Sequence, residues 1–424
     1  MKKITSYLNN TLTGLTTSKA TIVNGVMIGI FVGLSIALYD WIITDLFIKN
    51  TKLLPASYIG LIPLLGMLST GFIIKYFNIK RTSMADDVVH AFHTDANNLE
   101  IKESIPKFFA SITTIGLGGS AGLEGSSKWL GAIIGLVIQK IIHFFKPLTE
   151  KKGDLKTALM TGASAGIAAI FKAPLSGTIM ALESPYKKGL AHDSLVQSFL
   201  GAAASYAVYT SIRGNQKFFM ISLNYQLKWQ DIFLCALMGV ITGIFSSTFL
   251  KTMLKMKVIF CKKFKILTKY LLGGLCLSIL AYMGFFFFHH YVTLYGGNDI
   301  IFNLFNNKYS AFESLIILAL KSLATIITFS FGGVGGLFLP SATLGACIGQ
   351  VFQIVFHFAT PGILPFIGVA SFIAASYNGL LLGPVLIAEI SGEPSLVILG
   401  IVASTIAYLV SNGISNSPHQ KDQH

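Results

Sequence analysis

The segment GGSAGLEGSSKWLGAIIG at residues 118–135 is nearly repeated as GGVGGLFLPSATLGACIG at residues 332–349. Ten of the eighteen positions are identical at a constant offset of 214 residues. Each copy places a glycine-rich turn at the start of an apolar helix, and this start carries Glu124 in the first copy and Phe338 in the second. A carboxylate at membrane depth costs about 2.5–3.5 kcal/mol on insertion scales. Glu124 is therefore the first candidate for a functional residue.

The repeat extends beyond this motif, because residues 170–183 align with residues 376–389 at an offset of 206. Aromatic, leucine, glycine and glutamate residues match at equivalent places: Phe171 with Tyr377, Leu175 with Leu381, Gly177 with Gly383 and Glu183 with Glu389. The alignment predicts two homologous halves, at residues 19–212 and 229–411. A polar N-terminal segment at 1–18 precedes them, and a short polar C-terminal tail at 413–424 follows.

Paired glycine-interrupted segments in two halves of a chain indicate a transport site at the interface between the repeats. Close helix packing through small residues is the alternative explanation of the same glycines. Packing alone does not require a glycine pair, a helix start and an ionisable residue at one place. The pattern therefore favours a transport site.

The composition is that of a membrane protein: 53% of the residues are hydrophobic, 12% are charged and the mean hydropathy is +0.67. Soluble domains carry about 25% charged residues. Five apolar runs approach or exceed the roughly 20 residues that span a bilayer; they lie at 21–46, 57–74, 231–250, 270–288 and 315–331. Because the alternating pattern of a barrel is absent, the sequence predicts an all-α polytopic membrane protein. Three shorter segments, at 86–96, 171–183 and 382–389, predict helices that stop inside the membrane.

The net charge of +14 comes from basic clusters between the apolar runs, the densest at 251–269. Such clusters mark cytoplasmic loops, and no soluble basic module of the kind that binds nucleic acid is visible. The four cysteines show no metal-binding or redox spacing, and no serine, histidine and aspartate constellation indicates an enzyme. The sequence therefore predicts no cofactor, no metal, no nucleic-acid partner and no enzymatic activity.

The two glycine-rich turns are suited to binding an anion. A helix N-terminus exposes unpaired N–H groups and about half a positive charge, and glycine lets the backbone approach a ligand closely. Two such helices that point at one midplane position would hold an anion without a lysine or arginine that binds too tightly for release. The Glu124 carboxylate is itself an anion that can occupy this site, and when protonated it can swing away. Glu124 is therefore a predicted gate and proton carrier.

With these features the chain resembles the CLC chloride channels and transporters over about residues 19–420. Residues 122–126 (GLEGS) are similar to the family's G-R-E-G-P gate motif, and residues 335–340 (GGLFLP) to its G-G-I-F-x-P motif. Residues 173–177 (APLSG) and 383–386 (GPVL) resemble further signature segments. The resemblance implies two inverted repeats with broken helices that meet at the bilayer midplane, and a homodimer with one pathway per subunit. The compact size favours a prokaryotic protein of the bacterial inner membrane.

The resemblance also assigns roles to residues at matching positions. It implies that Glu124 is the external gating glutamate. The implied central anion site consists of backbone N–H groups of the second turn, at Leu337, Phe338 and Leu339. The implied outer site consists of backbone N–H groups of the first turn, at Gly122, Leu123 and Gly125. The family's inner serine falls at Ser83, where the surrounding motif is not retained. The alternative for Ser83 is an ordinary N-cap of the helix that follows.

Three positions depart from the family pattern and are possible inner-gate residues. Ser184 stands where family exchangers carry the internal proton-transfer glutamate, and a serine does not titrate at useful pH. Gln420 stands at the position of the family's pore tyrosine. Lys172 replaces a residue that is commonly asparagine, and it either pairs with Glu183 or reaches the aqueous vestibule.

The expected function is transmembrane transport of chloride or a similar small anion, by chloride/proton antiport gated by Glu124. The alternative is a passive chloride channel without proton coupling, because the internal proton glutamate is replaced by Ser184 and the pore tyrosine is missing. Ser83 favours chloride, bromide or nitrate over fluoride, because the fluoride-exporting branch of the family lacks the inner serine. The expected partners are the transported anion, protons if transport is coupled, and membrane lipid.

Overall fold

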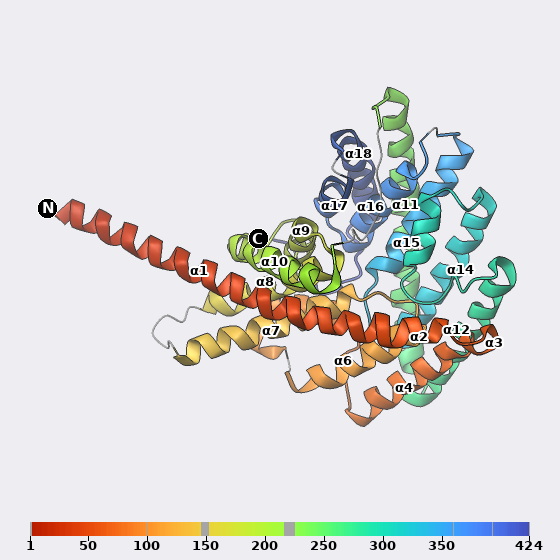
Figure 1. Ribbon diagram of the computed structural model, residues 1–424, viewed down its shortest axis with the longest axis horizontal. Coiled ribbons are helices and arrows are strands. Elements are labelled where there is room, and N and C mark those ends of the chain that lie inside the picture. The colour runs from red at the N-terminus through yellow and green to blue at the C-terminus, as the bar shows by residue number, and fades with distance from the viewer. Residues whose placement is uncertain are drawn as a thin grey trace.

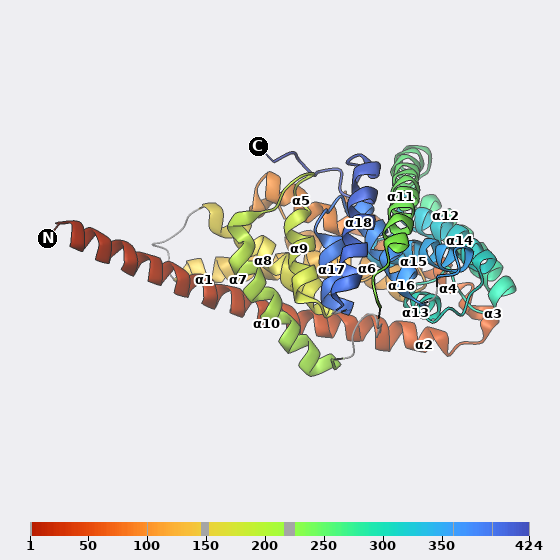
Figure 2. The same ribbon diagram turned by 90° about the horizontal axis from the view of Figure 1, so that it is seen from above.

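The computed structural model of the chain describes residues 2–99, 101–145, 152–215, 225–358, 360–391 and 393–423. Helices make up most of these residues, and the extended pairings among them are two isolated bridges. Figures 1 and 2 show the helices gathered into one body, from which the N-terminal end of α1 projects. Residues 2–18, expected as a separate polar segment, form the first part of this helix.

The two halves supply corresponding series of helices. The first half contains α1 (Lys2–Asp40), its π-helical continuation η1 (Trp41–Ile48), α2 (Lys49–Lys52), α3 (Ala56–Ile59), α4 (Ile62–Tyr76), α5 (Met84–His93), the short 3-10 helix η2 (Ala96–Asn98), α6 (Ile101–Gly116), α7 (Glu124–Phe145), α8 (Lys152–Phe171), α9 (Pro174–Glu183), the 3-10 helix η4 (His192–Ser194) and α10 (Leu195–Arg213). The second half contains α11 (Trp229–Lys263), α12 (Ile266–Phe288), α13 (Asn298–Phe305), α14 (Ala311–Ser330), α15 (Phe338–Val355), α16 (Ile363–Tyr377), α17 (Leu382–Ser391) and α18 (Pro394–Ser411).

Equivalent helices pack in equivalent ways in the two halves. In the first half α7 packs against α8, and α1 packs against α10. In the second half α15 packs against α16, and α11 packs against α18. The doubled motif begins α7 at Glu124 and α15 at Phe338, so the internal repeat of the sequence is also a repeat of structure.

Eight helices in the described part of the chain are long and apolar enough to cross a membrane. All five apolar runs found in the sequence lie within these helices, which confirms the polytopic all-α prediction. The other three are α7, α15 and α18, and polar or small residues break up their apolar sequences. The short helices predicted inside the membrane are α5, α9 and α17, which are ten residues long each.

The start of α9 differs from the sequence expectation, which began the segment at residue 171. Phe171 is instead the last residue of α8. Lys172 follows in the left-handed region with a φ of 52°, and Pro174 then occupies the first turn of α9. Because proline lacks an N–H group and disfavours helical geometry in the residue before it, the chain turns here rather than continuing one helix.

The two glycine-rich turns meet in an antiparallel bridge at the centre of the protein. The Gly122 N–H donates to the Gly336 carbonyl oxygen at 2.8 Å, and the Gly336 N–H donates to the Gly122 carbonyl oxygen at 2.7 Å. Each glycine thus makes the same bond to its repeat mate, as inverted repeats require at the point where they meet. The bridge places the N-terminus of α7 beside the N-terminus of α15.

A second reciprocal contact joins α9 and α17. Glu183, the last residue of α9, accepts hydrogen bonds from the N–H groups of Leu381 and Leu382 at 2.8 and 3.0 Å. Its repeat mate Glu389 accepts from the N–H groups of Leu175 and Ser176 at 2.8 and 2.7 Å. Each glutamate therefore satisfies the unpaired N-terminal N–H groups of the other half's short helix.

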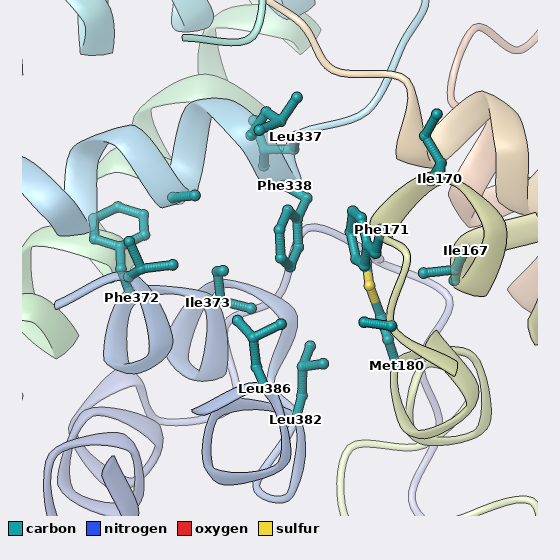
Figure 3. Packing of buried hydrophobic residues seen from close by; sticks show 14 of the residues in the cluster. Ile167, Ile170, Phe171, Met180, Leu337, Phe338, Phe372, Ile373, Leu382 and Leu386 are labelled. Carbon is teal, nitrogen blue, oxygen red and sulfur yellow. The ribbon is translucent and has the colours of Figure 1, made fainter. Parts of the chain in front are cut away.

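The apolar core joins the halves around Phe338, whose side chain is fully buried. Its ring centroid lies 4.1 Å from that of Phe171 and 6.2 Å from that of Tyr377. Figure 3 shows the Phe338 ring facing Phe171 across the boundary between the halves, with Leu382 and Leu386 on one side. The Phe338 ring therefore packs, while its backbone N–H remains at the helix start.

We predict that Glu183→Ala destabilises the protein by about 2–3 kcal/mol, because two buried or half-buried N–H groups lose a charged acceptor. Thermal unfolding of the detergent-solubilised protein should show a lower midpoint. Asp193→Ala removes an exposed carboxylate and serves as the control. Equal midpoints for the two variants would contradict the structural role of the reciprocal caps.

Candidate functional site

The Glu124 carboxylate lies at the junction of the two glycine-rich turns. It is the first residue of α7 and is 1% exposed. Its Oε1 accepts a hydrogen bond from the N–H of Phe338, the first residue of α15. Its Oε2 has no hydrogen-bond partner among the described residues. The N-terminus of α15 thus holds an anionic group contributed by the opposite half of the chain.

Two glycines make room for this carboxylate. A Cβ atom added at Gly122 would overlap Glu124 Oε2, and one added at Gly336 would overlap Glu124 Oε1. The nearest atoms to the Gly122 position all belong to the flexible Glu124 side chain. A Cβ at Gly125, by contrast, would come within 2.9 Å of the Gly335 carbonyl oxygen, which is rigid backbone.

Two cavities approach the Glu124 turn from different sides. The large cavity has a volume of about 680 Å³, and its lining includes Gly122, Leu123 and Leu339. The small cavity has a volume of about 100 Å³, and its lining includes Glu124 and Gly125. Neighbouring residues of one turn therefore line different cavities, and Glu124 itself lines the small one.

The small cavity brings together most of the residues predicted for the inner side: Ser83, Ser184, Gln420 and Leu337 line it together with Glu124. Ser83 is the N-cap residue of α5, but its side chain makes no capping hydrogen bond. The structure therefore does not show the ordinary side-chain cap that was the alternative role for Ser83. Its hydroxyl is left on the cavity wall, where it can donate a hydrogen bond to an anion.

Lys172 lies apart from the residues that line the small cavity. Its Nζ donates to the Gly214 carbonyl oxygen at 2.8 Å and lies over the Tyr209 ring at 5.9 Å. The left-handed turn between α8 and α9 directs the side chain toward the end of α10. It neither pairs with Glu183 nor lines the small cavity.

Of the backbone groups expected to bind anions, those of Gly122 and Phe338 are occupied in this conformation. The Gly122 N–H donates to Gly336, and the Phe338 N–H donates to Glu124. Only the second of these bonds involves a movable side chain. Departure of the Glu124 carboxylate would free the Phe338 N–H for another anion, whereas freeing the Gly122 N–H would require opening the bridge between the halves.

Three residues of the small cavity were not singled out from the sequence for the site: Lys128, Tyr377 and Asp86. Lys128 is 4% exposed, and its Nζ donates to Ser184 Oγ at 2.7 Å. The sequence could have drawn attention to Lys128, because the second copy of the doubled motif carries Ala342 at the equivalent position. Tyr377 is the repeat mate of Phe171, but no sequence pattern shows that it faces a cavity.

The C-terminal tail closes one wall of the small cavity. The Gln420 Nε2 donates to the Tyr377 carbonyl oxygen at 3.2 Å. Ser417 Oγ donates to Asp86 Oδ1 at 2.5 Å, and His419 Nδ1 lies 2.7 Å from Asp86 Oδ2. Asp86 therefore anchors the C-terminal tail to α5. An amide side chain, Gln420, stands at the position where the family pattern has an aromatic one.

Lys107 has a structural role beside the cavity. Its Nζ lies 2.8 Å from Glu103 and 3.0 Å from Asp87. Lys107 is thus committed to two carboxylates and is not a lining residue of the small cavity.

Comparisons with known proteins agree with this architecture. A family model described as voltage gated chloride channel matches residues 65–412. An uncharacterized protein of Methanocaldococcus jannaschii is 26% identical over 368 residues, which cover 86% of this chain and 87% of that protein. A CLC-type fluoride/proton antiporter has a similar structure with a TM-score of 0.81 at 22% identity, covering 96% of this chain and 98% of the other. A slow cyanobacterial Cl⁻/H⁺ antiporter gives a TM-score of 0.80 at 18% identity, covering 92% and 94%.

We predict that Gly122→Ala displaces the Glu124 carboxylate, because the new methyl group overlaps only that flexible side chain at close range. Removing a competitor from the Phe338 N–H should tighten chloride binding, by about three- to tenfold if the carboxylate occupies the site most of the time. Isothermal titration calorimetry in detergent measures this affinity.

The control is the same substitution in a Glu124→Ala background, where no carboxylate remains to be displaced. There Gly122→Ala should leave chloride affinity unchanged. An equal gain in both backgrounds would show that the methyl group acts by some route other than Glu124.

Proposed function

Because the chain belongs to the voltage gated chloride channel family, we propose that it transports chloride or a similar small monovalent anion across a membrane in exchange for protons. The observation that carries this proposal is the Glu124 carboxylate bound to the Phe338 N–H, in a turn that lines the small cavity at Glu124 and the large cavity at Gly122 and Leu123. A side chain that is both an anion and a base occupies the place suited to the transported anion.

Competition at the Phe338 N–H links anion and proton movement. While Glu124 is ionised, its carboxylate fills the helix N-terminus and blocks the passage between the cavities. Protonation removes the charge that the α15 N-terminus favours, so the side chain leaves and an anion takes its place. Return of the carboxylate expels the anion and requires loss of the proton. The Phe338 N–H thus binds the Glu124 carboxylate and the transported anion in turn.

The lysine cluster at 251–269 supports a cytoplasmic position for the small cavity, because Lys257 lines that cavity and clusters of basic residues favour the cytoplasmic side. Ser83 then stands at the inner entrance with a hydroxyl free of capping. We infer that it binds the anion before the anion reaches the amides of Leu337, Phe338 and Leu339. A hydroxyl donor at this place supports chloride over fluoride in the proposal.

Passive chloride conduction is the second candidate. Ser184 favours it, because a hydroxyl cannot carry a proton between the cytoplasm and Glu124 as a carboxylate would. Gln420 also favours it, because an amide side chain blocks a passage less completely than an aromatic ring. Antiport is preferred because Glu124 is retained and occupies the amide site. Two structural relatives described as proton-coupled antiporters support the same choice.

The proposal includes a multi-pass location in a bacterial inner membrane and a homodimer with one pathway in each subunit. The eight candidate spans among the described residues support the first part. The family resemblance supports the second.

We predict that purified protein in liposomes moves protons against their gradient when a chloride gradient is imposed. The reversal potential under opposed gradients should therefore lie away from the chloride Nernst value and shift with the pH gradient. A reversal potential at the chloride value that ignores pH would overturn antiport in favour of the channel. Faster transport of fluoride than of chloride would overturn the anion assignment.

We also predict that Glu124→Gln abolishes proton movement, because an amide cannot carry the proton. In the wild type, chloride flux should rise as pH falls, since protonation frees the Phe338 N–H. In Glu124→Gln, chloride flux should be independent of pH. The measurement is chloride efflux from liposomes over a range of pH, and an unchanged pH profile in the variant would show that Glu124 is not the gate.

A further inference from the structure

Lys128 carries a buried amine whose presence the gate alone does not explain. It lies on α7 four residues after Glu124, so both side chains project from one face of the helix. Only 4% of its surface is exposed. The equivalent residue in the second copy of the motif is Ala342, which shows that the helix start packs without a lysine. Lys128 therefore belongs to the part of the motif in which the two halves differ.

The partner of Lys128 is a neutral hydroxyl. Its Nζ donates to Ser184 Oγ at 2.7 Å, and Ser184 Oγ donates in turn to the Ala181 carbonyl oxygen at 2.6 Å. Lys107, on the preceding helix, instead contacts two carboxylates. Lys128 is thus held in place without being locked into an ion pair by this contact. Its amine therefore lies beside Ser184, the position at which family exchangers carry the internal proton-transfer glutamate.

The titratable and charged groups around Lys128 come from four helices and share the small cavity: Asp86 on α5, Glu124 on α7, Lys257 on α11 and Tyr377 on α16. Asp86 lines the same cavity as Lys128. Asp86 is in turn bonded to His419, whose side chain is 39% exposed. Titratable groups therefore extend from the buried gate through the cavity to the protein surface.

We propose that Lys128 is the proton-transfer residue between Glu124 and the cytoplasmic solution, in place of the carboxylate that Ser184 does not supply. The inference rests on the proposed function, because it concerns the route of the exchanged proton. Glu124 and Lys128 lie one turn apart, and both line the small cavity, whose volume of about 100 Å³ has room for water. Ser184 positions the amine, because its Oγ accepts a hydrogen bond from Lys128 Nζ.

The proposed transfer moves one proton from Glu124 to Lys128 and then to the cytoplasmic side. The protonated Glu124 carboxyl gives its proton to the neutral Lys128 amine, so that an O–H bond breaks and an N–H bond forms. A carboxylate and an ammonium result, and the carboxylate returns to the Phe338 N–H. The ammonium then releases a proton to cavity water or to the Asp86 carboxylate, and the neutral amine is restored. Proton uptake from the cytoplasm runs through the same steps in reverse.

The sharpest test is Lys128→Arg, assayed in liposomes for both ions. Arginine keeps the positive charge and the hydrogen-bond donors, but its guanidinium does not release a proton in proteins. If Lys128 transfers protons, the ratio of protons to chloride transported should fall about tenfold or more, while chloride still moves. Lys255→Arg, at an exposed position of α11, is the matched control and should keep the wild-type ratio.

Rescue by a carboxylate separates proton transfer from a structural role. Lys128→Met should lose coupling as Lys128→Arg does, and Lys128→Met combined with Ser184→Glu should regain it. Wild-type coupling ratios in both Lys128→Arg and Lys128→Met would overturn the inference and leave antiport standing. Failure of the double variant to regain coupling, although it transports chloride, would also count against it. Absence of proton movement in the wild type would instead overturn antiport itself, and the inference with it.

Discussion

The structure depends on one hydrogen bond, in which the N–H of Phe338 donates to the Glu124 carboxylate across the boundary between the two halves. A buried carboxylate is costly unless donors compensate it. Here the donors are main-chain groups at a helix start, where no cation is needed. The two glycines that face the carboxylate, and the bridge that sets the two helix starts side by side, all serve to bring these groups together. Because the bond holds a side chain rather than backbone, it can open without unfolding either half.

Comparison of the two halves separates structural residues from functional ones. The reciprocal bonds of Gly122 with Gly336, and the caps made by Glu183 and Glu389, are the same in both halves and hold the fold together. The small cavity is lined by residues that differ between the halves. Glu124 corresponds to Phe338, Lys128 to Ala342 and Ser184 to Ile390. At the first two of these positions the titratable side chain is present only in the first copy of the motif, so the two halves contribute different chemistry to the pathway.

Much of this arrangement could be predicted from the sequence, because it is carried by local patterns. The apolar runs predicted the long spans, and the doubled glycine motif predicted the paired helix starts with Glu124 at one of them. The place of Lys172 could not be predicted, because it depends on a left-handed turn that directs the side chain toward Gly214. The contact of Lys128 with Ser184 joins residues 56 positions apart on different helices. The anchoring of the tail on Asp86 spans more than three hundred residues, and no local pattern encodes such a contact.

The most direct test of the central claim is to locate an anion at the Phe338 N–H. Crystals of the wild type and of Glu124→Ala can be soaked in the same concentration of bromide, and the anomalous scattering of bromide mapped. We expect bromide within hydrogen-bonding distance of the Phe338 N–H in Glu124→Ala, and the Glu124 carboxylate in that place in the wild type. Absence of bromide from this N–H in the variant, or bromide beside an undisplaced carboxylate in the wild type, would contradict the account.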